Sequence, residues 1–240
     1  DLLREGRMED PFWKDNEDEA LKLMEYDYEY STSFSCEGKL LASDEVILRF
    51  EGLDTIADIT LNGVKLGHVE NMHRTWEYSV KELLKAEDNV LSVYFYSPTK
   101  YIAEAFEKAP TLGTEDAMNG FVHIRKAHCM FGWDWGAHLP DAGIWRPVTL
   151  MGVDTARLIS AEVLQYHEEG KVNLEIKPEI ALAANLPVQE KLDVKVTITD
   201  PTGKEIICQK GCEEYITVEN PMLWWPNGYG EQSLYTVSVD

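Results

Sequence analysis

The chain has 240 residues, and its 22 Lys and Arg against 43 Asp and Glu give a formal net charge of −21. This acidic balance argues against nucleic acid and against an anionic membrane surface as partners, because both are bound through clustered Lys and Arg. Hydrophobic residues make up 44% of the chain and no apolar run reaches the ~18 residues of a membrane span, so we expect a folded, soluble protein without a membrane partner.

The first thirty residues are acidic. They contain eleven Asp and Glu against four Lys and Arg, a pattern typical of a solvated face with short helical turns. Pro11, Phe12 and Trp13 interrupt the charges with an apolar cluster, which indicates that the segment is tied down.

Apolar and polar side chains then alternate, as half-buried strands require. The alternation predicts strands around residues 28–34, 46–50, 59–61, 64–66, 76–80 and 91–95. Asn62-Gly63 stands between two of them and predicts a hairpin with a type I′ turn, because both residues accept a positive φ. One helix is expected from Tyr101 to Ala109. Evenly spaced short strands with a single helix predict a β-sandwich or jelly roll.

From about Ala156 the composition shifts toward β-branched residues. Strands are predicted at residues 158–166, 172–176, 192–198 and 234–239, with a turn at residues 200–203. This pattern predicts a smaller, immunoglobulin-like sandwich. The expected fold class is therefore all-β, with one domain at 1–154 and a second at 155–240, whose last strand we expect to be cut near Asp240.

The cysteines and histidines do not form a metal-binding pattern. Four cysteines are too few and too scattered for a disulfide framework. Cys208 and Cys212 leave a hairpin bridge or half of a metal site open, but no second pair stands at matching spacing, so free thiols are expected. His123, His128 and His138 also lack the spacing of a zinc site and are expected to form ordinary hydrogen bonds.

Five of the seven tryptophans fall in two short segments, residues 131–147 and 221–228. Neither segment has strand alternation or helical spacing, so both are expected to be irregular loops. Aromatic faces beside a carboxylate are the chemistry of a sugar site, whereas tryptophans that fill a core are the alternative. Asp134 stands between Trp133 and Trp135, where an acid is desolvated and needs either a partner such as Arg146 or a ligand.

These segments resemble a known family. Residues 131–148, FGWDWGAHLPDAGIWRPV, closely resemble a segment of the β-mannosidases of glycoside hydrolase family 2. Further matches are DPFWKDNE at 10–17, FEGLDTIADITLNGVKLG at 50–67 and PMLWWPNGYGEQSLY at 221–235, so the resemblance covers essentially the whole chain. The Asn-Gly hairpin and the Trp-Trp-Pro-Asn-Gly run occur across the wider family, and they indicate the family more than the substrate.

The resemblance implies a galactose-binding-like jelly roll, then an immunoglobulin-like sandwich, then a (β/α)8 barrel that carries the two catalytic glutamates of a retaining, exo-acting β-mannosidase. These 240 residues do not include that barrel, so we expect no catalytic residue and no activity in them. Asn16-Glu17 is the only Asn-Glu pair, but no apolar strand precedes it, which argues against a catalytic role.

Site residues follow from the same resemblance. Trp133 and Asp134 would bind the terminal mannose, with Asp134 accepting hydrogen bonds from its O4 and O6 hydroxyls. Asn16 would line the same wall as a weaker match, while Trp135 and Arg146 would support the loop. The implied partners are a mannose-containing oligosaccharide and the chain's own C-terminal barrel, and no cofactor or metal is implied.

The chain also departs from the family. Ala137 and His138 stand where the family usually has Pro after Trp-Asp-Trp-Gly, and the loss of a Pro loosens a loop. A non-catalytic carbohydrate-binding module and a β-galactosidase or β-glucuronidase of the same family stay open as alternatives. The absence of Asn-x-Ser/Thr acceptors and of a signal-peptide pattern favours a bacterial cytoplasm over a periplasmic or lysosomal location, and the sequence predicts no particular oligomeric state.

Overall fold

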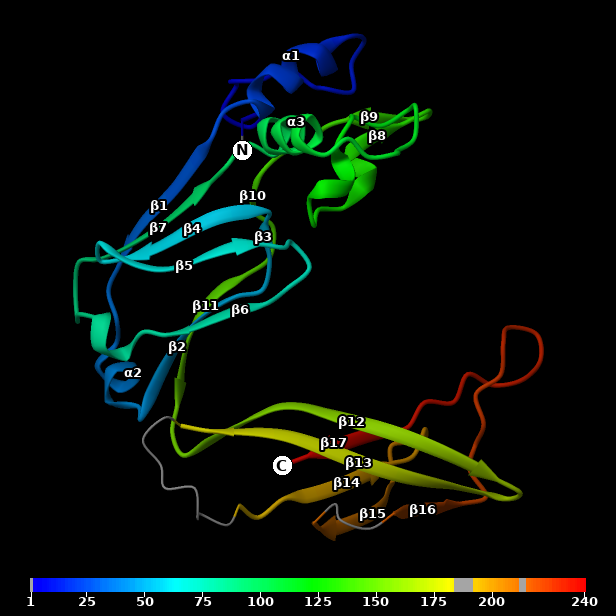
Figure 1. Ribbon diagram of the computed structural model, residues 1–240. Helices are drawn as coiled ribbons and strands as arrows, with labels where there is room; N and C mark the ends of the chain where they lie inside the picture. Colours follow the sequence, from blue (N-terminus) through cyan, green and yellow to red (C-terminus); the bar gives the residue numbers. More distant parts are fainter. Residues whose placement is uncertain (1, 184–191, 212–214) are drawn as a thin grey trace. The chain divides into compact units, whose positions relative to one another are not determined.

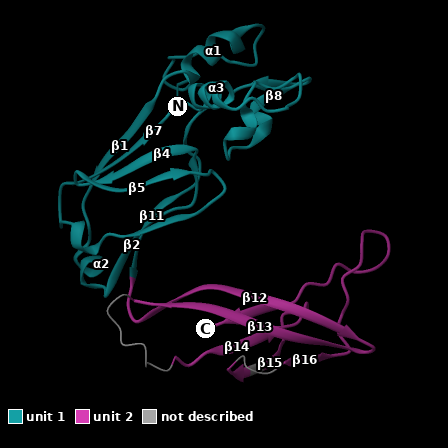
Figure 2. Cartoon of the chain, in the orientation of Figure 1, with its two compact units in different colours: residues 1–152 teal, residues 153–240 magenta. Residues whose placement is uncertain are grey.

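The computed structural model describes residues 2–183, 192–211 and 215–240. The chain divides into two compact units, residues 1–152 and residues 153–240 (Figure 2). The division falls two residues before the predicted boundary at Asp154. No helix in the described residues is both long enough and apolar enough to cross a membrane.

Unit 1 is built around two β-sheets. The four-stranded sheet has the order β1 (Tyr28–Phe34), β7 (Asn89–Phe95), β4 (Ile56–Leu61), β5 (Val64–Glu70), and the three-stranded sheet has the order β11 (Val148–Val153), β2 (Glu45–Phe50), β6 (Trp76–Ser79) (Figure 1). A two-stranded pair, β10 (Gly143–Ile144) with β3 (Leu53–Asp54), lies beside them. The predicted strands of this half are confirmed.

The core of unit 1 is supplied by the alternating apolar residues of these strands. Phe50 of β2, Ile59 of β4 and Phe95 of β7 are fully buried in one apolar cluster. Each such side chain contributes about 1.5–3 kcal/mol when it leaves water. Alternation along a strand sends every second side chain inward, which is why the period-2 pattern located the core.

The predicted Asn-Gly hairpin between β4 and β5 is confirmed. Asn62 and Gly63 have φ of +51° and +81°. The Asn62 amide donates to the Leu83 carbonyl (2.7 Å), and its oxygen accepts from the Val90 amide (2.8 Å). The turn residue therefore also fixes the start of β7.

The expectation of a single helix is wrong. In the described residues, α1 (Asn16–Met24) and α2 (Gly38–Ala42) precede α3 (Pro98–Lys108), with 3₁₀ turns at η1 (Lys81–Leu83), η2 (Phe121–His123) and η3 (His128–Met130). Helix α1 forms in the acidic segment because its Ala20 and Met24, four residues apart, bury the same face. Helix α3 begins earlier than predicted because Ser97 caps it by accepting from the Lys100 amide.

The first tryptophan segment contains a regular hairpin, so the expectation of an irregular loop is wrong there. Strands β8 (Phe131–Trp133) and β9 (Gly136–His138) form a short antiparallel hairpin within it. A hairpin of two three-residue strands is too short to produce a recognisable alternation. Figure 1 shows this hairpin at one end of unit 1, together with α1 and α3.

Unit 2 is a smaller sandwich of two three-stranded sheets. One has the order β12 (Ala156–Glu168), β13 (Lys171–Leu182), β16 (Ile216–Glu219), and the other has the order β15 (Glu205–Lys210), β14 (Lys195–Thr199), β17 (Thr236–Val239). Every buried side chain among its described residues is apolar, and Ile176, Val196 and Ile198 lie in this core. The predicted turn at residues 200–203 is confirmed, because Asp200 accepts from the backbone amides of Thr202 and Lys204.

The thiols are only partly described. Cys36 is a buried free thiol, and burial raises its pKa, whereas Cys129 is exposed and free. The hypothesis about Cys208 and Cys212 concerns a side chain and a residue that lie outside the described part of the chain.

Candidate functional site

The tip of the β8–β9 hairpin presents an acid between two indole rings. Trp133 and Trp135 are 43% and 82% exposed, and their ring centroids lie 5.6 Å apart with an interplanar angle of 57°. Asp134 is exposed as well and has no hydrogen bond or ion pair with any described residue. The expectation that the indoles desolvate this acid is therefore wrong, because all three side chains face solvent at the turn.

A carboxylate from α1 anchors the hairpin. One oxygen of Glu17 accepts from the backbone amide of His138 (2.7 Å) and lies 2.6 Å from the Nδ1 atom of its ring. The hydrogen bond from the His138 amide, reinforced by the ring, lowers the pKa of Glu17. The contact joins residues 121 positions apart in the sequence and ties β9 to α1.

The other ring nitrogen of His138 reaches a second segment. Its Nε2 atom lies 3.1 Å from the Asp116 carbonyl oxygen. Gly132 leaves room for this ring, because a Cβ atom there would lie 2.3 Å from two of the ring atoms of His138. Its φ of +103° is also a conformation that favours glycine. Gly132 and His138 thus fit together across the hairpin.

The root of the hairpin is held by apolar packing. Phe131, at the start of β8, is fully buried in a cluster with Ile56, Ile102 and Ile124. Its carbonyl accepts from the Met118 amide (3.0 Å). One end of the hairpin is therefore fixed in a core while the other faces solvent.

A buried ion pair supports the same region. Lys126 is fully buried, and its Nζ atom contacts the Asp54 carboxylate of β3 and donates to the Asp141 carbonyl (2.7 Å). Thr55 also donates to Asp54. The pair ties the segment before the hairpin to β3 and to the segment after it. Sequence reasoning missed it because the two residues stand 72 positions apart and no local pattern pairs them.

The side chains of Asn16 and Arg146 contact residues outside the hairpin tip. The side-chain amide of Asn16 donates to the Asp10 carbonyl (2.9 Å), and the fold brings Asn16 near the hairpin only through its neighbour Glu17. The Arg146 guanidinium stacks on the Trp145 ring at 4.1 Å from the centroid and does not pair with Asp134. The Trp145 ring nitrogen donates to the Met72 carbonyl (3.2 Å), so any loop support from Arg146 acts through Trp145.

Trp135 contributes little to holding the loop. Its ring contacts Trp133 and is otherwise in solvent. The anchoring comes from Glu17 and His138, which sequence reasoning missed in this role. The only signal available was that His138 departs from the family pattern.

The second tryptophan segment lies in unit 2 and differs in kind. Trp224 and Trp225 are 51% and 48% exposed, and they border a cavity of about 700 Å³. Its lining is aliphatic, aromatic and neutral polar, with His167 as its one titratable imidazole and no carboxylate among the described residues. Among the described residues, this segment offers aromatic surface without a carboxylate acceptor for sugar hydroxyls.

The three histidines that were weighed as zinc ligands are separately engaged. His123 contacts the Ala109 carbonyl (2.9 Å), His128 packs against Phe121 with ring centroids 4.9 Å apart, and His138 contacts Glu17. Within residues 2–183, 192–211 and 215–240, no group of three or more His, Cys, Asp or Glu is arranged to hold a metal ion.

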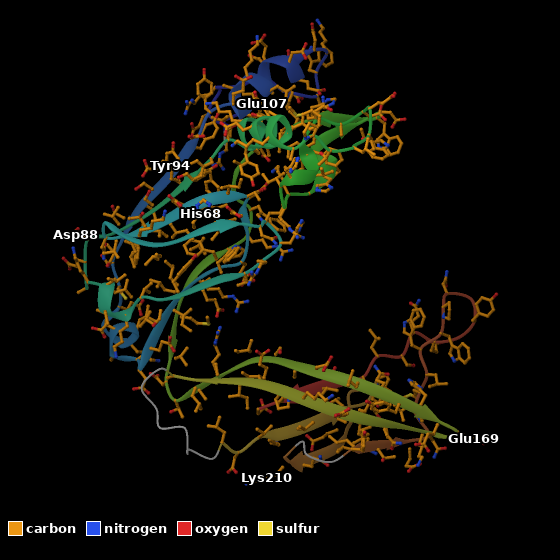
Figure 3. The ribbon with its side chains drawn as sticks, viewed as in Figure 1. His68, Asp88, Tyr94, Glu107, Glu169 and Lys210 are labelled. Atoms are coloured by element: carbon orange, nitrogen blue, oxygen red, sulfur yellow. The ribbon has the colours of Figure 1, made fainter. Side chains whose placement is uncertain are left out.

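Carboxylate, imidazole and phenol groups also occur on the outer face of the four-stranded sheet. Figure 3 shows His68 and Tyr94 on this sheet. Asp58 accepts from Lys65 (2.8 Å) and Tyr96 (3.1 Å) and contacts His68 (2.6 Å). These groups satisfy one another, so this face is a surface network rather than an open site.

Two family models match the chain. One, described as glycosyl hydrolase 2 galactose-binding domain-like, matches residues 1–146, which is more than half of the chain. The other, described as glycosyl hydrolases family 2, matches residues 155–240. The two matches correspond to the two sandwiches.

Curated relatives of the chain include several β-mannosidases. The beta-mannosidase of Bos taurus is 26% identical over 99% of this chain, and beta-mannosidase B of Aspergillus flavus is 31% identical over 100% of it. The chain spans 29% of the length of each of these proteins.

Solved structures resemble the chain to different degrees. The beta-D-mannosidase from Dictyoglomus thermophilum matches with a TM-score of 0.89 and 35% identity, over 100% of this chain and 30% of that one. A beta-glucuronidase from an uncultured Clostridium species matches with a TM-score of 0.62 and 17% identity, over 89% of this chain and 32% of that one. The second match shows the fold alone.

Proposed function

The chain belongs to glycoside hydrolase family 2, and from this premise we propose that it is the N-terminal portion of a retaining, exo-acting β-mannosidase. In this proposal the two sandwiches precede a (β/α)8 barrel that supplies both catalytic glutamates. Unit 1 contributes one wall of the active site through the tip of its β8–β9 hairpin. Support comes from relatives and a solved structure that are named β-mannosidases and match the whole chain.

The single observation that carries the proposal is the free acid at the hairpin tip. Asp134 is exposed between Trp133 and Trp135 and has no partner among the described residues. A carboxylate accepts hydrogen bonds at two oxygens, and neighbouring indole faces pack against the carbon-bound hydrogens of a sugar ring. We assign Asp134 to the O4 and O6 hydroxyls of the terminal mannose and Trp133 to its apolar face.

The barrel would perform the bond cleavage. Retaining hydrolysis uses two carboxyl groups about 5–5.5 Å apart, one as nucleophile and one as acid and base. Glu17 does not take either role, because its carboxylate is committed to His138. The contribution of this chain is recognition of the sugar. When the site closes over a sugar that lacks a matching hydroxyl, the Asp134 carboxylate is desolvated and left without a hydrogen bond. This cost selects against the wrong sugar.

The experiment is hydrolysis of an aryl β-mannoside by the polypeptide in which these residues precede the barrel. Asp134→Ala should lower kcat/KM by roughly ten- to hundredfold, because a hydrogen bond to a charged group is worth about 1.5–3 kcal/mol. Glu107→Gln, at an exposed position on α3, is the matched control and should leave the rate unchanged. An Asp134→Ala enzyme with wild-type kinetics would refute the assignment.

A carbohydrate-binding module is the alternative, and the exposed indole pair is what favours it. The 240-residue chain should show no turnover and should bind mannose only weakly, because half of the proposed pocket belongs to the barrel. Isothermal titration calorimetry with mannose and with a β-mannoside tests this. A micromolar dissociation constant would favour the module. Turnover by the 240-residue chain would refute the proposal that catalysis requires the barrel.

A further inference from the structure

We infer that Glu17 and His138 are positioning residues, in which a doubly protonated His138 and an ionised Glu17 hold the Trp133–Asp134–Trp135 tip in its sugar-binding pose. The claim that this pose serves sugar binding rests on the proposed function. The anchoring itself rests on geometry within unit 1.

The surroundings of the His138 ring favour its charged form. Nδ1 lies 2.6 Å from a Glu17 carboxylate oxygen, and Nε2 lies 3.1 Å from the Asp116 carbonyl oxygen. Both neighbours are hydrogen-bond acceptors, whereas a neutral imidazole has only one N–H to donate. Both contacts are hydrogen bonds only when both ring nitrogens carry a proton.

Glu17 holds the backbone and the ring of His138 at the same time. The carboxylate oxygen that faces Nδ1 also accepts from the His138 amide (2.7 Å). Its pKa is lowered, chiefly by that backbone hydrogen bond, so it stays ionised to a lower pH than an ordinary Glu. A charge-assisted bond of this kind is about twice as strong as a neutral one.

The elements packed against His138 bring few other charges to the ring. They are α1, η3, β8 and the segment around Asp116. On these elements and at the tip, the other titratable or charged side chains are Asp18, Glu19 and Lys22 of α1, His128 and Cys129 of η3, Glu115, Asp116 and Asp134. His128 packs on Phe121 and Asp134 faces solvent, so Glu17 is the described ionisable side chain that contacts the ring.

The position of His138 in the hairpin makes it a control point for the tip. His138 pairs with Phe131 in the β8–β9 register, and only Gly132 through Ala137 lie beyond it. Phe131 is fixed in the apolar cluster, so β9 is the strand whose pose depends on the Glu17 contact. Loss of either charge frees one side of the hairpin and lets Asp134 move.

The Glu17 anchor depends on pH. The lowered pKa of Glu17 means that its anchoring is present above the ordinary Glu range and is lost as pH falls through its folded-state value. The tip should therefore lose order at acidic pH, as Glu17 becomes protonated.

The experiment uses the 240-residue chain without sugar. Nitrogen-15 NMR at about pH 5.5 should show protons on both ring nitrogens of His138. Hydrogen exchange of the amides from Trp133 to His138, corrected for intrinsic pH effects, should speed up by about tenfold in Glu17→Gln, because the charge-assisted bonds are lost. Glu19→Gln, on the same helix in an exposed pair with Lys22, is the matched control and should leave that exchange unchanged.

The pH response separates positioning from simple packing. In the wild type, tip exchange should rise as pH falls through the range in which Glu17 becomes protonated. In His138→Gln it should be fast whether or not Glu17 is ionised. One ring proton in the NMR measurement, or Glu17→Gln exchange within twofold of Glu19→Gln, would overturn the inference.

The outcome is distinguishable from failure of the proposed function. If the tip responds as expected while Asp134→Ala leaves mannoside hydrolysis unchanged, the anchor stands and the sugar assignment fails. In the barrel-bearing polypeptide, Glu17→Gln should raise KM more than it lowers kcat, since it alters how the sugar is met rather than the cleavage step. An unchanged KM beside a loosened tip would contradict the functional purpose of the anchor.

Discussion

The two tryptophan segments have similar composition and different construction. The tip of the β8–β9 hairpin is fixed by residues far away in sequence, since Glu17 and His138 are 121 positions apart. The Trp224–Trp225 segment is held by local bonds: Trp225 donates its amide to the Glu231 carbonyl, and the Met222 amide donates to the Tyr235 hydroxyl 13 positions away. Aromatic content therefore does not distinguish a positioned surface from a locally folded loop.

The cores of the two units also differ, in whether they contain buried polar side chains. In the described residues, the buried polar and charged side chains all belong to unit 1: Ser43, Asp54, Thr55, Asn89, Ser97 and Lys126. The buried cluster of unit 2 is apolar throughout. Buried polar contacts accept few alternative arrangements, so unit 1 is the more sharply specified of the two.

The strongest test of this difference removes the buried cation of unit 1. Lys126→Ala leaves the Asp54 carboxylate buried without its partner and should lower the free energy of unfolding by about 3–5 kcal/mol. Lys108→Ala, in an exposed pair with Glu104 on α3, should change it by less than about 0.5 kcal/mol. Urea unfolding of the 240-residue chain measures both. Equal losses of unfolding free energy in the two variants would show that burial does not determine how much an ion pair stabilises the fold.

A second test compares two glycines with positive φ. Gly132→Ala forces a Cβ against His138 and should cost about 1–3 kcal/mol. Gly170 has φ of +75° with no atom within 4 Å of an added Cβ, so Gly170→Ala should cost about 1 kcal/mol from backbone strain alone. The difference, read from urea unfolding, measures the fit between Gly132 and His138. Equal losses would contradict that fit.

The smallest expected effect concerns surface carboxylates. Hydrogen bonds from Lys65, and then from His68 and Tyr96, lower the pKa of Asp58 from 3.8 to about 2. Ionised Asp58 therefore stabilises the fold above about pH 4, and this contribution is lost as pH falls toward 2. Asp58→Asn should cost about 1 kcal/mol or less at neutral pH and nothing near pH 2.

Glu175 on β13 of unit 2 is the matched comparison for Asp58. Its pKa is also lowered, by hydrogen bonds from Lys177 and then Tyr166, but it has fewer partners than Asp58 and its side chain is 32% exposed against 24% for Asp58. Glu175→Gln should therefore shift stability less than Asp58→Asn at every pH. Thermal unfolding followed from about pH 2 to about pH 7 compares the two variants. A larger effect at Glu175 would refute the ranking.

Local patterns in the sequence determined much of the architecture. Alternation located β2, β4 and β7, because every second residue of a half-buried strand is apolar. Asn62-Gly63 located its turn, because the φ values that it needs are a property of those two residues. Helix α1 was anticipated only as short helical turns, because its acids conceal the single apolar face made by Ala20 and Met24.

At the candidate site the sequence identified the acid and its flanking indoles, but not how they are held. Trp133, Asp134 and Trp135 are neighbours, so a motif could mark them. Glu17 with His138 and Asp54 with Lys126 are separated by 121 and 72 positions, and each residue alone looks like an ordinary polar side chain. The order of strands and the packing of α1 against β9 bring them together. The sequence by itself determined the order of the acid and its flanking indoles, and only the tertiary structure decided how the hairpin that carries them is held in place.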